Sequence, residues 1–142
     1  MRFQRKKRSR GGVLVESAFT ITAFLAVTLG VLDIGQVMFN HQGLVERARA
    51  GAAWAGSRVF DAEQVKNMVV YNTTSPTNHA TPMYPNLATS LVTATLFDAG
   101  TTEARVVVKI SNYPYTFFSP WIAGMYTART ITAVASHEAS LP

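Results

Sequence analysis

The stretch GGVLVESAFTITAFLAVTLGVLDIG, residues 11–35, decides how the rest of the chain is organised. No charged residue stands between Glu16 and Asp33, and apart from serine and threonine every residue there is apolar or glycine. A chain of 142 residues has room for one domain and an anchor, but little core in which to hide such a segment. We therefore expect residues 12–56 to form one long helix whose first part spans a membrane.

Three interpretations of the apolar stretch compete. A cleaved signal peptide has an apolar core of about 7–15 residues followed by a small-residue cleavage site, whereas this stretch is longer and closes at Asp33. A buried helix of a soluble protein is disfavoured by the short chain. A membrane helix needs about 20 residues, so either Glu16 enters the apolar layer or the span continues past Asp33. The membrane helix is the favoured interpretation.

Residues 1–11 form a basic leader. Six of the 13 Lys and Arg residues lie in the first ten positions, and from Gly11 onward acidic residues slightly outnumber basic ones. The charges nearest the apolar stretch are Arg5, Lys6, Lys7, Arg8 and Arg10. Positive charge beside a span marks its cytoplasmic side, which puts the C-terminal part on the far side. A basic run can also bind nucleic acid or act in nuclear import, but its place before a span favours a topology signal.

Residues 57–142 carry all six prolines and are expected to form a small domain. Asp61 followed by Gln64 is a capping-box pattern that opens a helix. Two alternating segments are separated by the turn signal Asp98–Gly100, which predicts an antiparallel hairpin. The expected elements are a short helix at 61–70 and strands at 89–97, 103–113 and 128–136. The fold class is therefore α+β, with a sheet of about three antiparallel strands that follows the long helix in the chain.

Gly11, Gly12 and Glu16 form a second pattern where the leader meets the helix. A charged side chain in a bilayer costs about 2.5–3.5 kcal/mol on insertion scales and is a functional candidate by default. A cut after Gly11 would make Gly12 the new N-terminus. Glu16 would then lie one helical turn from the protonated amine of its own chain, or could meet the amine of a neighbouring subunit. A glycine also lets a protease approach the backbone closely. A cut after Gly12 would instead make Glu16 the fourth residue.

The sequence RSRGGVLVES resembles the prepilin-peptidase site of type IV-like pilins, in which a basic leader ends in glycine and glutamate is the fifth mature residue. More narrowly, residues 8–56 resemble the TadE-like pseudopilins of the tight-adherence (Flp) pilus system. The family's Gly-x-x-Asp-x-Gly pattern is Gly30, Asp33 and Gly35 here, and ERARAGAAWA follows as its Ala/Arg-rich helix. Residues 104–136 resemble the family loosely.

The chain departs from the family pattern at two positions. Ser17 stands where an aromatic residue usually follows the glutamate, and Gln36 stands where an arginine is common. Neither position removes the logic of cleavage after Gly11.

The resemblance implies a minor pilin-like (pseudopilin) subunit that acts in assembly or initiation of a Flp/Tad-type pilus. It implies no enzyme activity and no cofactor. The implied partners are a prepilin peptidase, other pilin or pseudopilin subunits, the inner-membrane assembly platform and membrane lipid. The implied location is the bacterial inner membrane, with the C-terminal domain in the periplasm or on an extracellular pilus. The alternative is an uncleaved signal-anchored envelope protein whose C-terminal domain binds a partner.

Further candidate residues follow from spacing and chemistry. Small side chains recur every four positions at Ala18, Thr22, Ala26 and Gly30, a pattern that lets membrane helices pack closely. Glu16 and Asp33 are the assembly candidates, although Asp33 can also simply mark the far membrane interface. The aromatic segment is read as domain core or helix–domain contact in preference to a partner site. Its candidate residues for a partner site are Tyr113, Phe117, Phe118 and Trp121.

The histidines give no metal-binding pattern. His41, His79 and His137 are far apart, and the chain has no cysteine. We expect His41 on the helix surface, His79 in a loop and His137 near a frayed end. No serine nucleophile or phosphate-binding loop is recognisable.

Overall fold

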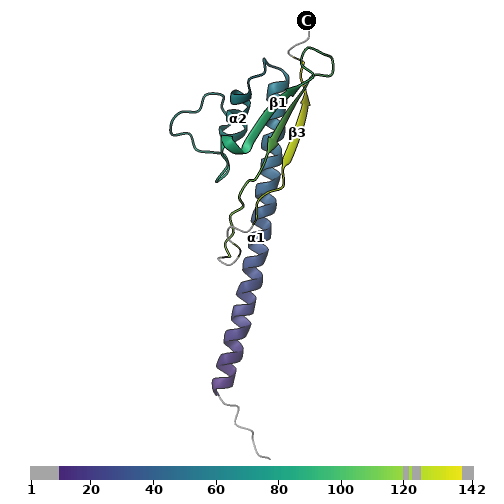
Figure 1. Ribbon diagram of the computed structural model, residues 1–142. Coiled ribbons are helices and arrows are strands. Elements are labelled where there is room, and N and C mark those ends of the chain that lie inside the picture. Colours follow the sequence, from purple (N-terminus) through teal and green to yellow (C-terminus); the bar gives the residue numbers. More distant parts are fainter. Residues whose placement is uncertain (1–9, 120–121, 123–125, 139–142) are drawn as a thin grey trace, which may run out of the picture.

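The computed structural model describes residues 10–119, 122 and 126–138. The helices are α1 (Arg10–Gly56) and α2 (Ala62–Tyr71), and a 3-10 turn, η1 (Thr89–Leu91), follows. The strands β1 (Val92–Phe97), β2 (Arg105–Ile110) and β3 (Ile131–Ser136) form one sheet. Figure 1 shows α2 and the sheet packed along the C-terminal half of α1, while the N-terminal half projects alone. The predicted α+β class is confirmed.

The projecting half of α1 is bare. Every residue from Gly11 to Thr28 is exposed, although most of these side chains are apolar. The helix from Gly11 to Gly56 is long and apolar enough to cross a membrane, with a mean hydropathy of 1.9 in its most apolar window. Only 6% of that window is buried. A core helix of a soluble protein would be covered by other elements, so these features fit a membrane-anchored protein.

The C-terminal half of α1 belongs to the core of the small domain. Its buried residues recur at helical spacing, so one stripe faces the other elements. The buried hydrophobic residues of this stripe are Leu44, Ala48, Ala52 and Ala55. The sheet contributes Val106, Val108 and Ile110, and α2 contributes Val65, Val69 and Val70. The small domain is thus built around α1, not attached to its end.

Glycines allow α1 to lie close to its neighbours. A Cβ at Gly51 would collide with the side chain of Val69 on α2. A Cβ at Gly43 would collide with the phenol ring of Tyr84. The small residues of this stretch therefore serve packing within the chain itself.

The sheet has the order β1-β2-β3, and both pairs are antiparallel. In the register Val108 lies opposite Ala94 and Ala133, and Ile110 lies opposite Ile131. The predicted hairpin is confirmed. The sheet buries Val106, Val108 and Ile110 of β2 and Ile131 and Ala133 of β3, and it also buries Val107 on the other face of β2. The first strand is shorter than expected, because residues 89–91 form η1.

Helix α2 begins at the predicted cap. Asp61 accepts hydrogen bonds from the N–H groups of Glu63 (2.9 Å) and Gln64 (3.2 Å). The Gln64 amide also donates to the Asp61 carboxylate at 3.0 Å. The Asp61 cap satisfies two of the four N–H groups that a helix start leaves free.

Candidate functional site

The two glycines of the predicted processing site lie in the first turns of α1. Gly11 and Gly12 are helical and exposed. Glycine costs about 1 kcal/mol in a helix relative to alanine, so the pair weakens a turn that already lies where helices fray. These features are compatible with the predicted cut between Gly11 and Gly12, which stays a prediction. Of the predicted leader charges, Arg10 begins α1, whereas Arg5, Lys6, Lys7 and Arg8 lie outside the described residues.

Glu16 lies on the bare part of α1. Its side chain is exposed, and within the described part of the chain no hydrogen bond or ion pair engages its carboxylate. Its backbone carbonyl accepts a hydrogen bond from the Thr20 hydroxyl at 2.9 Å. Gly12 lies one turn before it on the same helix, as predicted. The assembly role of Glu16 stays a prediction.

The four small residues of the predicted packing stripe also lie on the projecting half. Ala18, Thr22 and Ala26 are exposed, and Gly30 is half-buried. The Thr22 hydroxyl donates to the Ala18 carbonyl at 2.8 Å, so its polar group is satisfied within the helix. A second helix could approach this side without leaving a hydroxyl unpaired. No other element covers the stripe between residues 18 and 28 in the described structure.

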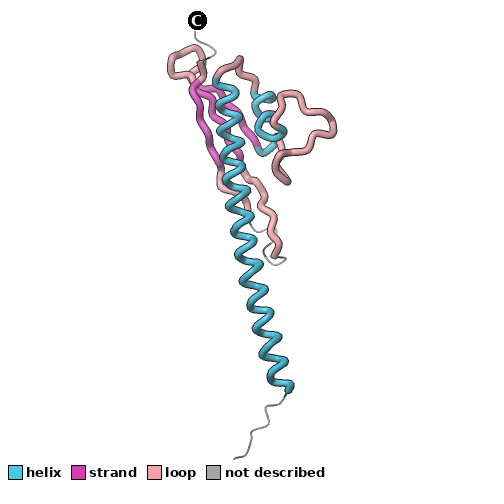
Figure 2. The backbone as a smooth tube through the Cα atoms, turned by 180° about the vertical axis from the view of Figure 1, so that it is seen from behind, coloured by secondary structure: helices cyan, strands magenta, loops and turns pink. Residues whose placement is uncertain are grey.

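Beyond the sheet, two extended segments run along α1 toward its bare half. We call residues 111–119 and 126–130 the arm (Figure 2). Its two sides are joined by a bridge between Pro114 and Thr127 and by a 2.7 Å hydrogen bond from the Ala128 N–H to the Tyr113 carbonyl. The arm therefore extends the domain down the helix.

Asp33 fastens the arm to α1. Its two carboxylate oxygens accept hydrogen bonds from the N–H groups of Phe118 (2.6 Å) and Ser119 (3.2 Å). Gln36 adds a 3.0 Å bond to the Thr116 hydroxyl. The Asp33 side chain is only 3% exposed, so it lies in a contact within the chain. Sequence spacing gave no sign of these partners, because they lie more than eighty residues away.

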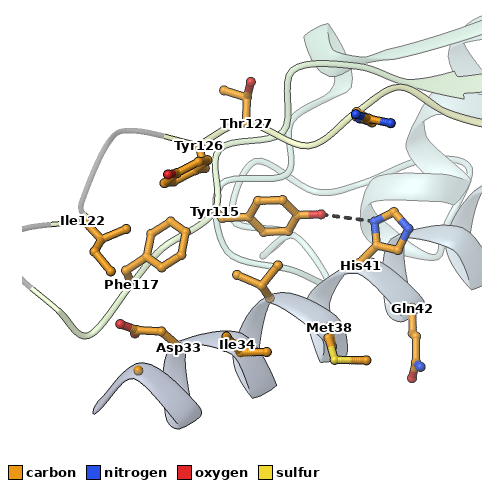
Figure 3. Close-up of a pocket in the computed structure, with 13 residues that line it drawn as sticks. Asp33, Ile34, Met38, His41, Gln42, Tyr115, Phe117, Ile122, Tyr126 and Thr127 are labelled. Carbon is orange, nitrogen blue, oxygen red and sulfur yellow. Dashed lines mark hydrogen bonds between the residues drawn. The ribbon is translucent and has the colours of Figure 1, made fainter. Parts of the chain in front are cut away.

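A groove of about 680 Å³ lies between the arm and α1 (Figure 3). The helix side is formed by Gly30, Asp33, Ile34, Val37, Met38 and His41, which recur at helical spacing. The arm side includes Tyr115, Phe117 and Tyr126. Phe117 and Tyr126 meet edge to face, with ring centroids 5.9 Å apart. The lining that the described residues provide is almost wholly apolar.

Two of the residues that line the groove form a polar pair. His41 Nδ1 and the Tyr115 hydroxyl share a hydrogen bond of 3.1 Å. Burial raises the pKa of Tyr115 above its usual value, so its hydroxyl stays neutral at physiological pH. His41 is exposed on the helix, as predicted. The pair positions the arm against α1.

The predicted aromatic residues divide into different environments. Tyr113 is fully buried in the core and donates to the Pro85 carbonyl at 2.7 Å. Phe117 lies between arm and helix. Phe118 is 63% exposed at the end of the arm. Trp121 lies outside the described residues. Core and helix–domain contact therefore account for Tyr113 and Phe117, but not for Phe118.

Among the described residues, no group of three His, Asp or Glu side chains could hold a metal ion. His79 lies in an exposed loop, as expected. The expectation for His137 is wrong. It is buried, and its Nε2 lies 2.9 Å from the Arg58 carbonyl. Because β3 pairs with β2, the residues after β3 return to the segment that follows α1. The position of His137 near the C-terminus did not indicate this contact.

The TadE-like protein family model matches residues 11–53. The match begins at the predicted cleavage site and ends inside the buried part of α1. It confirms the resemblance over the long helix, and the looser resemblance at 104–136 stays a prediction. No curated protein and no solved structure matches the chain.

Proposed function

We propose, on the premise that residues 11–53 are those of a TadE-like protein, that the chain is a minor pilin-like subunit of a Flp/Tad-type pilus system. In this proposal a prepilin peptidase cuts between Gly11 and Gly12, and the mature subunit acts in pilus assembly or initiation. The protein is thus a substrate of processing and not an enzyme. Its other partners are pilin or pseudopilin subunits and the inner-membrane assembly platform.

The observation that carries the proposal is the bare half of α1. Residues 11–28 expose many apolar side chains. Exposure of such a large apolar surface to water is unfavourable. Lipid can cover them before assembly, and the same helix of other subunits can cover them afterwards. The small stripe from Ala18 to Gly30 suits such helix packing.

Glu16 fits the same scheme. After cleavage the amine of Gly12 carries a positive charge near neutral pH. Glu16 can then pair with this amine in its own chain or in a neighbour, and each charge lowers the cost of placing the other in an apolar layer. Removal of the basic leader also removes the charges that hold the N-terminus in the cytoplasm.

The proposed topology follows from the charges. Residues 1–11 are a cytoplasmic leader, residues 12–56 are the helix with its inner-membrane span, and residues 57–142 are a periplasmic domain. Incorporation in an extracellular pilus would move that domain to the filament surface. The exposed outer face of the sheet is compatible with either place.

The proposal is tested by sequencing the N-terminus of the protein expressed with and without a prepilin peptidase. We expect mature chains to begin at Gly12 only when the peptidase is present. Gly11→Leu should keep the leader, whereas Gly35→Leu, at a helix glycine with open space around it, should still be cut. Glu16→Ala should be cut but fail to assemble, while Glu46→Ala on the exposed far part of α1 should assemble normally.

The alternative predicts different chains. An uncleaved signal-anchored envelope protein would keep residues 1–11 with or without the peptidase, and Gly11 and Glu16 would be replaceable without effect. Its arm and sheet would then serve a binding partner of the C-terminal domain. Mature chains that begin near residue 50 would indicate an ordinary signal peptide and would contradict both schemes.

A further inference from the structure

The end of the arm contacts α1 at a defined position along the helix, at Asp33. Twenty residues of helix are about 30 Å long, the thickness of the hydrocarbon core of a bilayer. Counted from Val13, such a span ends at Leu32. Asp33, which follows directly, binds the arm through the N–H groups of Phe118 and Ser119. The end of the arm is therefore held where the span would leave the hydrocarbon.

The side chains at this height suit a membrane interface. Phe118 is 63% exposed, and Tyr126 is 59% exposed. On the adjoining turns of α1, Ile34 and Met38 are also mostly exposed. Tyrosine, with an apolar ring and a polar hydroxyl, gathers at the level of lipid headgroups, and an exposed phenylalanine can enter the apolar edge of that layer. Ile34, Met38 and Tyr126 line the same groove, and Phe118 directly follows Phe117, which lines it too. We call these exposed residues the apolar surface.

The charges are also compatible with lipid. The described residues of the arm include no acidic side chain, and Arg129 is their single charge. Asp33 beside the arm is already bound by two N–H groups. Arg129 lies at the base of the arm, two residues before β3, and not at its end. No carboxylate on the described residues of the arm would repel an anionic lipid headgroup.

We propose that the end of the arm, with Phe118 and Tyr126, lies in the headgroup layer of the bilayer that α1 spans. The occupant of this apolar surface is phospholipid. The inference rests on the membrane anchoring in the proposed function, but not on cleavage at Gly11. The arm gives the domain a second contact with the membrane and fixes the tilt of the domain and α1 relative to the bilayer. Leaving the membrane for a filament would require this contact to be released.

The test uses the full chain in vesicles of phosphatidylcholine and phosphatidylglycerol. Since the chain has no cysteine, single cysteines can carry a polarity-sensitive fluorophore. The variants are Phe118→Cys, Phe97→Cys and Phe24→Cys. Phe97 is an exposed phenylalanine at the end of β1, opposite Arg105 in the sheet. Phe24 lies in the span. Quenching is measured with one nitroxide attached to the lipid near the top of the acyl chain, at the expected depth of residue 118, and with another near the end of the acyl chain, at the expected depth of residue 24.

We expect quenching and a blue shift for the labels at 118 and 24, and neither for the label at 97. Quenching at 24 without quenching at 118 would overturn the arm inference and leave the membrane anchor standing. Absence of quenching at 24 would overturn both. A blue shift at 118 that lipid nitroxide does not quench would mean that protein, such as a second copy, covers the arm, and this would also overturn the inference.

Discussion

Arg47 ties α2 to α1 by a set of contacts made from a single side chain. Its guanidinium donates to the carbonyls of Met68 and Val69 and to the Asn72 side chain. Both carbonyls belong to the last turn of α2, where helix carbonyls lack partners. The Met68 carbonyl also accepts from the Asn72 N–H at 3.1 Å. Burial lowers the pKa of Arg47, but a guanidinium remains charged in proteins. The charge also lies at the favourable end of the α2 dipole.

We predict that Arg47→Met destabilises the domain by about 1–3 kcal/mol, because partly buried carbonyls lose their donors. Arg49→Met is the matched control, since Arg49 is exposed on the same helix. The control should change stability by less than about 0.5 kcal/mol. Both are measured by denaturant unfolding of the full chain in detergent, followed by near-ultraviolet circular dichroism. Equal effects of the two substitutions would refute the role of Arg47.

At the scale of elements, the contact of α1 with α2 depends on the absence of a side chain. Val69 fills the space that a Cβ at Gly51 would need. Val69 is fully buried and cannot move aside without disturbing the core. The Ala/Gly-rich sequence here is thus explained by packing between two helices of the same chain.

We predict that Gly51→Leu costs about 1–3 kcal/mol or more, as overpacking does. Ala53→Leu on the exposed side of the same turn should be close to neutral, because leucine and alanine are both good helix formers. Thermal unfolding of both variants measures the two changes in stability. A Gly51→Leu protein as stable as the Ala53→Leu protein would mean that α2 is not held against α1 as described.

The elements themselves were largely predictable from sequence, whereas their long-range contacts were not. Apolar alternation predicted β2 and β3, and the Asp61 cap predicted the start of α2, because these signals are local. The arm has no such periodicity, and Pro114 interrupts any pattern. The partners of Asp33 and His137 lie about eighty residues away along the chain. Only folding of the sheet onto α1 brings them together.

For the whole molecule, the main question is where the domain begins. Sequence composition divides the chain at residue 57. The core nevertheless includes Leu44, Ala48, Ala52 and Ala55 of α1 together with the inner face of the sheet. A fragment that starts at residue 57 would expose that face to water. The arm would lose Asp33 and His41 as well.

We therefore predict that residues 33–142 fold as a cooperative unit without the bare half of α1, whereas residues 57–142 alone do not. The longer fragment keeps the core stripe of α1, the Arg47 contacts and the Asp33 anchor of the arm. The measurement is thermal unfolding followed by circular dichroism, with size-exclusion chromatography to detect aggregation. If residues 57–142 melted cooperatively at a similar temperature, α1 would not be part of the cooperative folding unit of the domain. If only the longer fragment does so, any force on the membrane helix acts directly on the core of the domain.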